Sequence, residues 1–174
     1  MLFRSDIAVA AEALYTADML LDWVMEKPED VILAKYRIDP GDLRGVVETS
    51  AWLVYSMAQL ARVTRHLAAA YLDKLAVMVK HGVQEELVEL VKLPGIGRVR
   101  ARRLYEAGYH SPSDLAGLNP EQLAQLLRGL GEERARQALA EAQRSARREH
   151  RASKEKLSTD GRRGQRSILD YLGG

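Results

Sequence analysis

The residues best suited to chemistry form a glycine-rich bend between two helix-compatible segments. The bend consists of Pro94, Gly95, Ile96 and Gly97, and it follows the apolar run at residues 87–91. Pro94 ends a helix because its ring lacks the N–H that would continue the hydrogen-bond ladder. Gly95 and Gly97 permit backbone angles and a close approach that a Cβ would obstruct. The apolar Ile96 is suited to packing against the helices on either side of the bend. The next helix begins with N–H groups and a positive dipole end that suit a phosphate.

Positive charge surrounds this bend, because four arginines follow it within six residues: Arg98, Arg100, Arg102 and Arg103. At 100° per residue, Arg98 and Arg102 share one helix face, whereas the apolar residues of the segment occupy another. The predicted chemistry is capture of a nucleic-acid phosphate by backbone N–H and guanidinium groups. A tight helical hairpin whose arginines only face solvent is the alternative interpretation.

Helices are the elements that must position the bend. The chain has 174 residues, of which 47% are hydrophobic and 29% charged, with few β-branched or aromatic residues, and this composition predicts an all-α fold. Apolar residues repeat at helical spacing in several segments. These segments are residues 6–26, 42–63, 64–80, 84–92 and 98–107, followed by a helix that begins at Pro120.

A second bend, formed by Gly129, Leu130 and Gly131, has the pattern of a degenerate copy of the first. Glu132 and Glu133 stand where a phosphate would sit, so we predict that this copy serves the structure and contributes little to DNA contact.

Composition excludes several classes of function. The chain has no cysteine, and its four histidines lack ligand spacing, so we predict no disulfide and no metal site. No apolar run approaches the roughly 18 residues that span a bilayer, which predicts a cytoplasmic, nucleoid-associated protein without a membrane partner. No glycine-rich loop ending in Gly-Lys-Ser/Thr is present, so we predict that this chain alone does not hydrolyse ATP.

Charge is unevenly distributed, although the net charge is only +2. Residues 144–166 carry nine Lys or Arg and three Asp or Glu, whereas residues 1–143 have a net charge of −3. We therefore predict a flexible basic tail with an anionic partner.

The tail ends in an apolar segment that resembles the short peptide by which DNA-processing proteins bind the sliding clamp. Its residues are Gln165, Ile168, Tyr171 and Leu172, and the three apolar ones converge on one side of a helical turn. In that family they would fill one pocket and Gln165 would occupy a neighbouring slot. A tail that folds back on the protein's own surface is the alternative.

Taken together, these features resemble a known pair of domains. The hairpin pattern LPGIGRVRARRL at residues 93–104 is similar to the helix-hairpin-helix family of sequence-independent DNA-binding motifs. The segments LLDWV at 20–24, PGDLR at 40–44 and VETSAWL at 47–53 resemble the ratchet domain of archaeal superfamily-2 DNA repair helicases, relatives of HelQ. The block at 95–108 resembles the helix-hairpin-helix domain that follows it there.

The resemblance implies a C-terminal portion of such a helicase without its motor, in three parts. These are a ratchet-like helical bundle at 1–83, a helix-hairpin-helix DNA-binding domain at 84–143 and the basic tail at 144–174. ATP and magnesium would belong to the absent motor domains, so no cofactor is expected here. The implied activity, 3′→5′ unwinding of forked DNA, belongs to a longer polypeptide or to a partner.

The resemblance also implies particular DNA contacts. In the family a long ratchet helix stacks a Trp and an Arg on the bases of the single strand. Trp52 matches that Trp, whereas the Arg position is Gly45 here, and its neighbour Arg44 projects about 80° from Trp52. Arg100 and Arg102 match a block that is thought to grip emerging single-stranded DNA and restrain unwinding.

We therefore expect a non-catalytic module that binds single-stranded or forked DNA, with a sliding clamp and helicase motor domains as protein partners. A docking scaffold for a helicase, nuclease or clamp is the second hypothesis. A base-excision glycosylase, with Asp114 as its carboxylate, is a third and weaker one, because Asp114 has the pattern of a helix-start acid.

Overall fold

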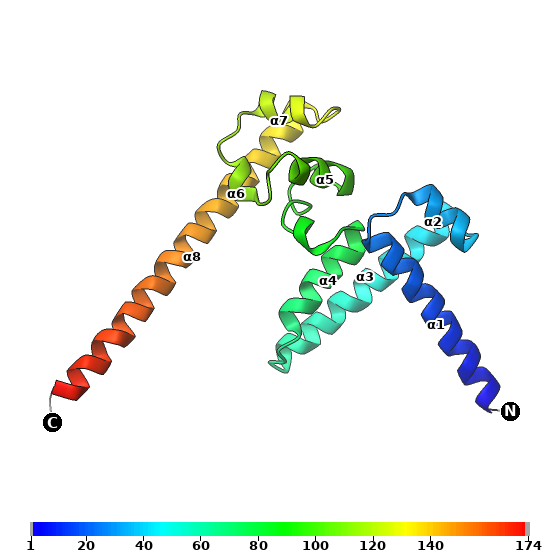
Figure 1. Ribbon diagram of the computed structural model, residues 1–174, viewed down its shortest axis with the longest axis horizontal. Helices are drawn as coiled ribbons and strands as arrows, with labels where there is room; N and C mark the ends of the chain where they lie inside the picture. Colours follow the sequence, from blue (N-terminus) through cyan, green and yellow to red (C-terminus); the bar gives the residue numbers. More distant parts are fainter. Residues whose placement is uncertain (1, 173–174) are drawn as a thin grey trace. The chain divides into compact units, whose positions relative to one another are not determined.

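The predicted all-α class is confirmed: the computed structural model describes residues 2–172, and these contain helices and no strand (Figure 1). Side chains are described for residues 6–148 and 150–154. The helices are α1 (Leu2–Val24), α2 (Glu29–Tyr36), α3 (Pro40–Val63), α4 (Ala69–His81), the 3-10 helix η1 (Glu85–Leu87), α5 (Arg98–Glu106), α6 (Pro112–Leu115), α7 (Pro120–Leu126) and α8 (Glu132–Leu172).

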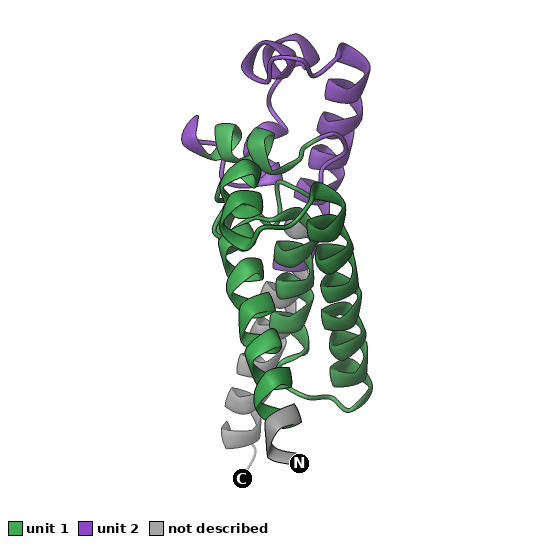
Figure 2. Cartoon of the chain, turned by 90° about the vertical axis from the view of Figure 1, so that its right-hand side faces the viewer, with its two compact units in different colours: residues 1–92, 96–105 green, residues 93–95, 106–174 purple. Residues whose placement is uncertain are grey.

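The chain divides into two compact units, coloured green and purple in Figure 2. Unit 1 comprises residues 1–92 and 96–105, and unit 2 comprises residues 93–95 and 106–174. The division therefore passes through the glycine-rich bend itself, between Gly95 and Ile96. The domain boundaries expected from the sequence, at 83/84 and 143/144, stay a prediction.

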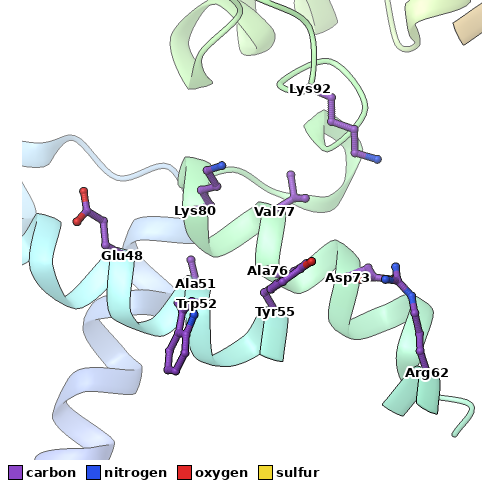
Figure 3. A pocket seen from close by; sticks show the side chains of 10 residues that line it. All are labelled: Glu48, Ala51, Trp52, Tyr55, Arg62, Asp73, Ala76, Val77, Lys80 and Lys92. Carbon is purple, nitrogen blue, oxygen red and sulfur yellow. The ribbon is translucent and has the colours of Figure 1, made fainter. Parts of the chain in front are cut away.

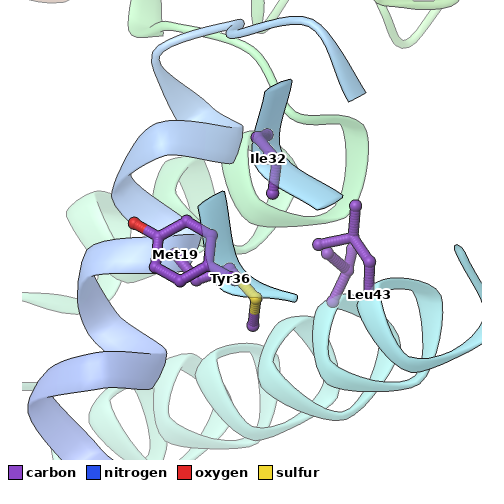
Figure 4. Close-up of a cluster of buried hydrophobic side chains, with 5 residues drawn as sticks. Met19, Ile32, Tyr36 and Leu43 are labelled. Carbon is purple, nitrogen blue, oxygen red and sulfur yellow. The ribbon is translucent and has the colours of Figure 1, made fainter. Parts of the chain in front are cut away.

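Unit 1 is built on α1, α2 and α3, which bury one apolar cluster between them (Figure 4). Its buried members are Met19, Ile32, Tyr36, Leu43 and Val47. Helix α3 then pairs with α4 after a break at residues 64–68, and the two lie side by side in Figure 1. Apolar burial of this kind stabilises by about 25 cal/mol per Å² removed from water, so the cluster fixes α3 in register against α1.

The turn after α4 depends on a glycine. Gly82 has φ +62°, and a Cβ built there would lie 2.5 Å from the Trp23 ring. The Trp23 Nε1–H donates a hydrogen bond to the Val79 carbonyl, at 2.8 Å. The end of α4 is therefore tied to α1 by one tryptophan, and only glycine fits opposite the ring.

The helix predicted over residues 84–92 is wrong. The segment contains the short 3-10 helix η1 followed by turns. Its apolar residues Leu87, Val88, Leu90 and Val91 are all at least 96% buried. Neighbouring residues in an α-helix point to different sides, so burying all four favours an irregular segment enclosed on several sides over a one-faced helix.

Unit 2 has a core of its own, built from a capped helix α7 and from the packing of α8 against α6 and α7. Asn119 accepts a hydrogen bond from the Gln122 N–H at 2.8 Å and so begins α7. The first part of α8 packs against α6 and α7 through small and apolar residues. Its buried members are Ala135, Ala138, Leu139 and Ala142.

Asp114 has a structural role. Its Oδ2 accepts hydrogen bonds from the backbone N–H groups of His110, at 2.9 Å, and Ser111, at 2.8 Å, at the start of α6. Burial would raise the pKa of this carboxyl, but those hydrogen bonds hold it below its usual range. Asp114 is thus a helix-start acid, as its sequence pattern indicated.

The backbone of α8 continues to Leu172. The side chains of the predicted clamp-binding residues Gln165, Ile168, Tyr171 and Leu172 lie outside the described ones, so clamp binding stays a prediction. Across residues 2–172, no helix combines the length and apolar character needed to cross a membrane.

A buried carboxylate joins α1 to α2. Asp22 is 5% exposed and accepts contacts from Lys27 Nζ at 2.6 Å, Lys35 Nζ at 2.8 Å and the Tyr36 hydroxyl at 3.0 Å. The hydrogen bonds from Lys27 and Lys35 hold the pKa of Asp22 well below its ordinary value. The folded state therefore prefers the ionised carboxylate more strongly than the unfolded chain does.

We predict that Asp22→Asn lowers the Tm at pH 7, because Lys27 and Lys35 lose their shared counter-charge. A carboxyl with a depressed folded pKa stabilises above its unfolded pKa of about 3.9 and loses that contribution as pH falls. The difference in Tm between wild type and variant should therefore shrink between pH 5 and pH 2 in thermal melts followed by circular dichroism. Asp18→Asn, which removes an exposed partner of the same Lys35, is the control and should cost less. Equal losses for the two variants would contradict the assignment.

Candidate nucleic-acid interface

The glycine-rich bend has the backbone geometry that its sequence predicted. Gly95 adopts φ +76°, a left-handed conformation that favours glycine. Ile96 is 3% exposed and acts as the expected apolar plug. Gly97 is exposed, a Cβ there would meet nothing within 4 Å, and its carbonyl accepts the first helical hydrogen bond, from the Ala101 N–H at 2.9 Å.

This geometry leaves the start of α5 accessible. The first N–H groups of a helix lack intrahelical acceptors, and the helix dipole adds partial positive charge there. The exposed Gly97 borders this turn without a side chain. The start of α5 can therefore accept an anion at close approach to the backbone.

The second bend repeats this geometry in unit 2. Gly129 has φ +78°, Leu130 is 3% exposed, and the Gly131 carbonyl accepts from the Ala135 N–H at 3.0 Å. The first turn of α8 begins with two exposed carboxylates, Glu132 and Glu133, at the positions that Arg98 and Val99 occupy in α5. The two bends share a fold, and only the first presents the charge that suits a phosphate.

Arg98 is engaged within unit 1. Its guanidinium lies 4.5 Å from the centroid of the Trp23 ring, and its Nη2 donates to the Lys27 carbonyl at 2.6 Å. Burial lowers the pKa of Arg98 from its usual value. This arginine stacks on a tryptophan and ties α5 to the end of α1.

Arg102 is engaged more strongly. Its Nε donates to Glu26 Oε2 at 2.9 Å, and its Nη2 donates both to Glu26 Oε1 and to Glu86 Oε1, the latter at 2.9 Å. The hydrogen bond to Glu26 raises the pKa of Arg102 further above its usual range. Burial alone would raise the pKa of Glu86, but the hydrogen bond from Arg102 holds it low. The planar guanidinium thus joins α5 to the turn after α1 and to η1 in the two-pronged geometry typical of arginine.

The other two predicted arginines differ from each other in exposure. Arg103 is exposed on α5, and Arg100 is partly buried. Sequence reasoning treated the four arginines as one group, and it missed Glu26 and Glu86 because these acids are 76 and 16 residues from Arg102. No local pattern marks such distant pairs.

The predicted stacking residue Trp52 lines a surface groove between α3 and α4 of unit 1 (Figure 3). Trp52 is 65% exposed, so it is not a core tryptophan. Tyr55, one turn further along α3, is 53% exposed, and Lys80 contributes positive charge from α4. Arg62, which is paired with Asp73, also lines the groove, whose volume is about 720 Å³.

Helix α3 places Gly45 on the same face as Trp52. Seven residues separate them, so they lie within about 20° of each other around the helix. A Cβ at Gly45 would meet nothing within 4 Å. Arg44 is exposed but belongs to a different side of α3, as the spacing predicted.

We predict that Arg102→Ala destabilises the chain by about 2 kcal/mol, because it leaves the Glu26 carboxylate, 13% exposed, without its counter-charge. Urea denaturation followed by circular dichroism measures the difference in free energy of unfolding. Arg103→Ala is the matched control and should stay within about 0.5 kcal/mol of wild type. A similar stability for both variants would show that the ion pairs of Arg102 with Glu26 and Glu86 add nothing to the free energy of unfolding.

Two known families match successive segments of the chain. Residues 4–82 match the family described as archaeal helicase, domain 4, and residues 87–144 match the SAM-like helix-hairpin-helix tandem family. The "ATP-dependent DNA helicase Hel308" of Thermococcus kodakarensis is 47% identical over 118 residues, which cover 67% of this chain and 10% of the relative.

The Hel308 of Caldivirga maquilingensis is 40% identical over 164 residues, which cover 90% of this chain and 21% of the relative. The Hel308 of Pyrococcus horikoshii is 41% identical over 121 residues, which cover 68% of this chain and 17% of the relative. The chain thus spans between a tenth and a fifth of the length of these curated relatives. It belongs to the archaeal Hel308-like superfamily-2 helicase family and carries that family's domain 4 followed by a helix-hairpin-helix tandem.

Proposed function

We propose that this chain is the non-catalytic, DNA-binding C-terminal region of an ATP-dependent 3′→5′ helicase that acts on single-stranded or forked DNA in replication-coupled repair. Its relatives are named ATP-dependent DNA helicases. The observation that carries the proposal is the exposed Trp52 in the groove between α3 and α4.

The exposed ring of Trp52 is suited to stacking on a ligand. Its ring is a large apolar surface that the fold leaves in water, beside a second aromatic ring, Tyr55. Flat aromatic faces flanked by cations such as Lys80 suit the bases and phosphates of a single strand, and stacking is tolerant of sequence. The groove therefore fits single-stranded DNA better than a small polar substrate.

The hairpin adds a backbone contact to this stacking contact. The start of α5 supplies N–H groups, and Arg103 and Arg100 supply charge. Arg98 and Arg102 contribute through position, because their partners Trp23, Lys27, Glu26 and Glu86 hold α5 in place. In this proposal Arg98 and Arg102 hold α5 in place, and the exposed Arg103 faces the DNA.

Protein docking is the second candidate, and α1 carries the observation that favours it. Ile7, Leu14 and Leu21 are 69%, 72% and 57% exposed at intervals of seven residues, which places them on one face. Such a stripe suits contact with another protein surface, for which the motor of the helicase is the expected partner.

We predict that Trp52→Ala weakens binding of a fluorescein-labelled single strand by five- to 150-fold, since stacking contributes about 1–3 kcal/mol per base. Fluorescence anisotropy at fixed salt measures the Kd. Tyr71→Ala, which removes an aromatic residue that is 64% exposed on α4 and does not line the groove, is the control and should bind as wild type does. If Trp52→Ala bound DNA unchanged, protein docking would be the better account of this surface.

We also predict that Gly45→Arg tightens single-strand binding by about two- to fivefold. An arginine there faces the same way as Trp52 without a clash, and a guanidinium stacked on a base adds about 0.5–1 kcal/mol. Gly45→Ala is the control, because it brings the same gain in helix propensity without the guanidinium. A gain of the same size in both variants would assign the effect to helix stability.

A further inference from the structure

We propose that the basic face of α8, formed by Arg147, Arg151 and Lys154, binds the phosphate backbone of duplex DNA. None of these three residues belongs to the hairpin or lines the Trp52 groove. The inference rests on the proposed function in one respect only, namely that the chain handles DNA.

The face begins where the packing of α8 ends. Ala142 is the last buried residue of the helix among those with described side chains, and residues 143–148 and 150–154 are all exposed or half-exposed. A helix that extends beyond its core loses apolar stabilisation, so its surface residues determine what it contacts. Here those residues are mainly cations.

The cations gather on one side of the helix. Relative to Arg147, Arg151 lies about 40° around the helix and Lys154 about 20° in the other direction. His150 lines the same surface. The three full charges span seven residues, or about 10 Å of helix at 1.5 Å per residue. Small residues such as Ser145 and Ala152 occupy the opposite side.

Neighbouring arginines on α8 differ because they are paired. Arg144 lies 3.3 Å and Arg148 4.0 Å from carboxylate oxygens of Glu141. Arg147, Arg151 and Lys154 have no ion pair among the described side chains. Among the described side chains, Arg144 and Arg148 thus share one counter-charge, whereas Arg147, Arg151 and Lys154 have none, and this suits an external polyanion.

Duplex DNA fits this face better than other polyanions. It carries one phosphate charge per roughly 1.7 Å of its axis, about twice the charge density of one strand, and so attracts a row of cations more strongly. The described part of the face has no Phe, Tyr or Trp side chain to stack on unpaired bases, as a single-strand site would. It also lacks the large apolar side chains that an interfacial membrane helix inserts.

The test compares two double variants of the full chain that lose the same charge from the same helix. Arg147→Ala/Arg151→Ala removes the proposed contacts, and Arg144→Ala/Arg148→Ala removes the paired arginines. Alanine favours helix at these exposed positions, and circular dichroism checks that it persists. Anisotropy with a labelled duplex and with a labelled single strand, each over a series of salt concentrations, gives Kd and the salt slope.

We expect Arg147→Ala/Arg151→Ala to weaken duplex binding and to reduce its salt slope by about two, while the control pair changes both much less. Its effect on the single strand should be the smaller one. Equal losses from the two double variants, an unchanged duplex affinity or an equal loss on both DNA forms would each overturn the proposal.

Gly97→Val separates this proposal from the proposed function, because its side chain would fill the open space beside the start of α5. If Gly97→Val and Trp52→Ala weaken single-strand binding while Arg147→Ala/Arg151→Ala leaves the duplex unaffected, the α8 site fails and the proposed function stands. If the α8 variant alone weakens binding, the α8 site stands and the hairpin and groove assignments fail.

Discussion

The ion pair between Arg102 and Glu26 is the interaction on which the rest of the candidate interface depends. It connects α5 to the end of α1, and Glu86 of η1 completes it. Two-pronged arginine pairs fix orientation as well as distance. The helix whose first turn is proposed to bind phosphate is therefore held by Glu26 of the helicase domain 4 region, 76 residues away in the sequence, and by Glu86, 16 residues away.

The two glycine-rich bends have the same backbone conformation but are followed by helix turns of different charge. Gly95 and Gly129 share the left-handed conformation, and Ile96 and Leu130 are buried alike. What differs is the charge of the helix turn that follows. An acidic first turn satisfies the dipole of α8 internally, whereas the first turn of α5 contains no acid and leaves that dipole for an external anion.

Sequence alone predicted the elements whose signals are local. Helical periodicity located α3 and α4, Asn119 with Pro120 located the start of α7, and the paired glycines located both bends. The helix predicted over residues 84–92 was wrong, because an apolar run without one-sided periodicity does not distinguish an α-helix from a buried irregular segment. The partners of Arg98 and Arg102 could not be predicted either, since only tertiary packing brings them together.

The two tryptophans of this chain occupy opposite environments. Trp23 is half-buried, with its indole N–H bonded to Val79 and a guanidinium on its ring, whereas Trp52 stands in solvent. Their intrinsic fluorescence therefore reports on two different events, namely loss of the contact between α1 and α5 and entry of a ligand into the groove. Emission from Trp23 follows the integrity of the joint between α1 and α5, and emission from Trp52 responds to whatever enters the groove, so the chain carries a built-in optical reporter for each.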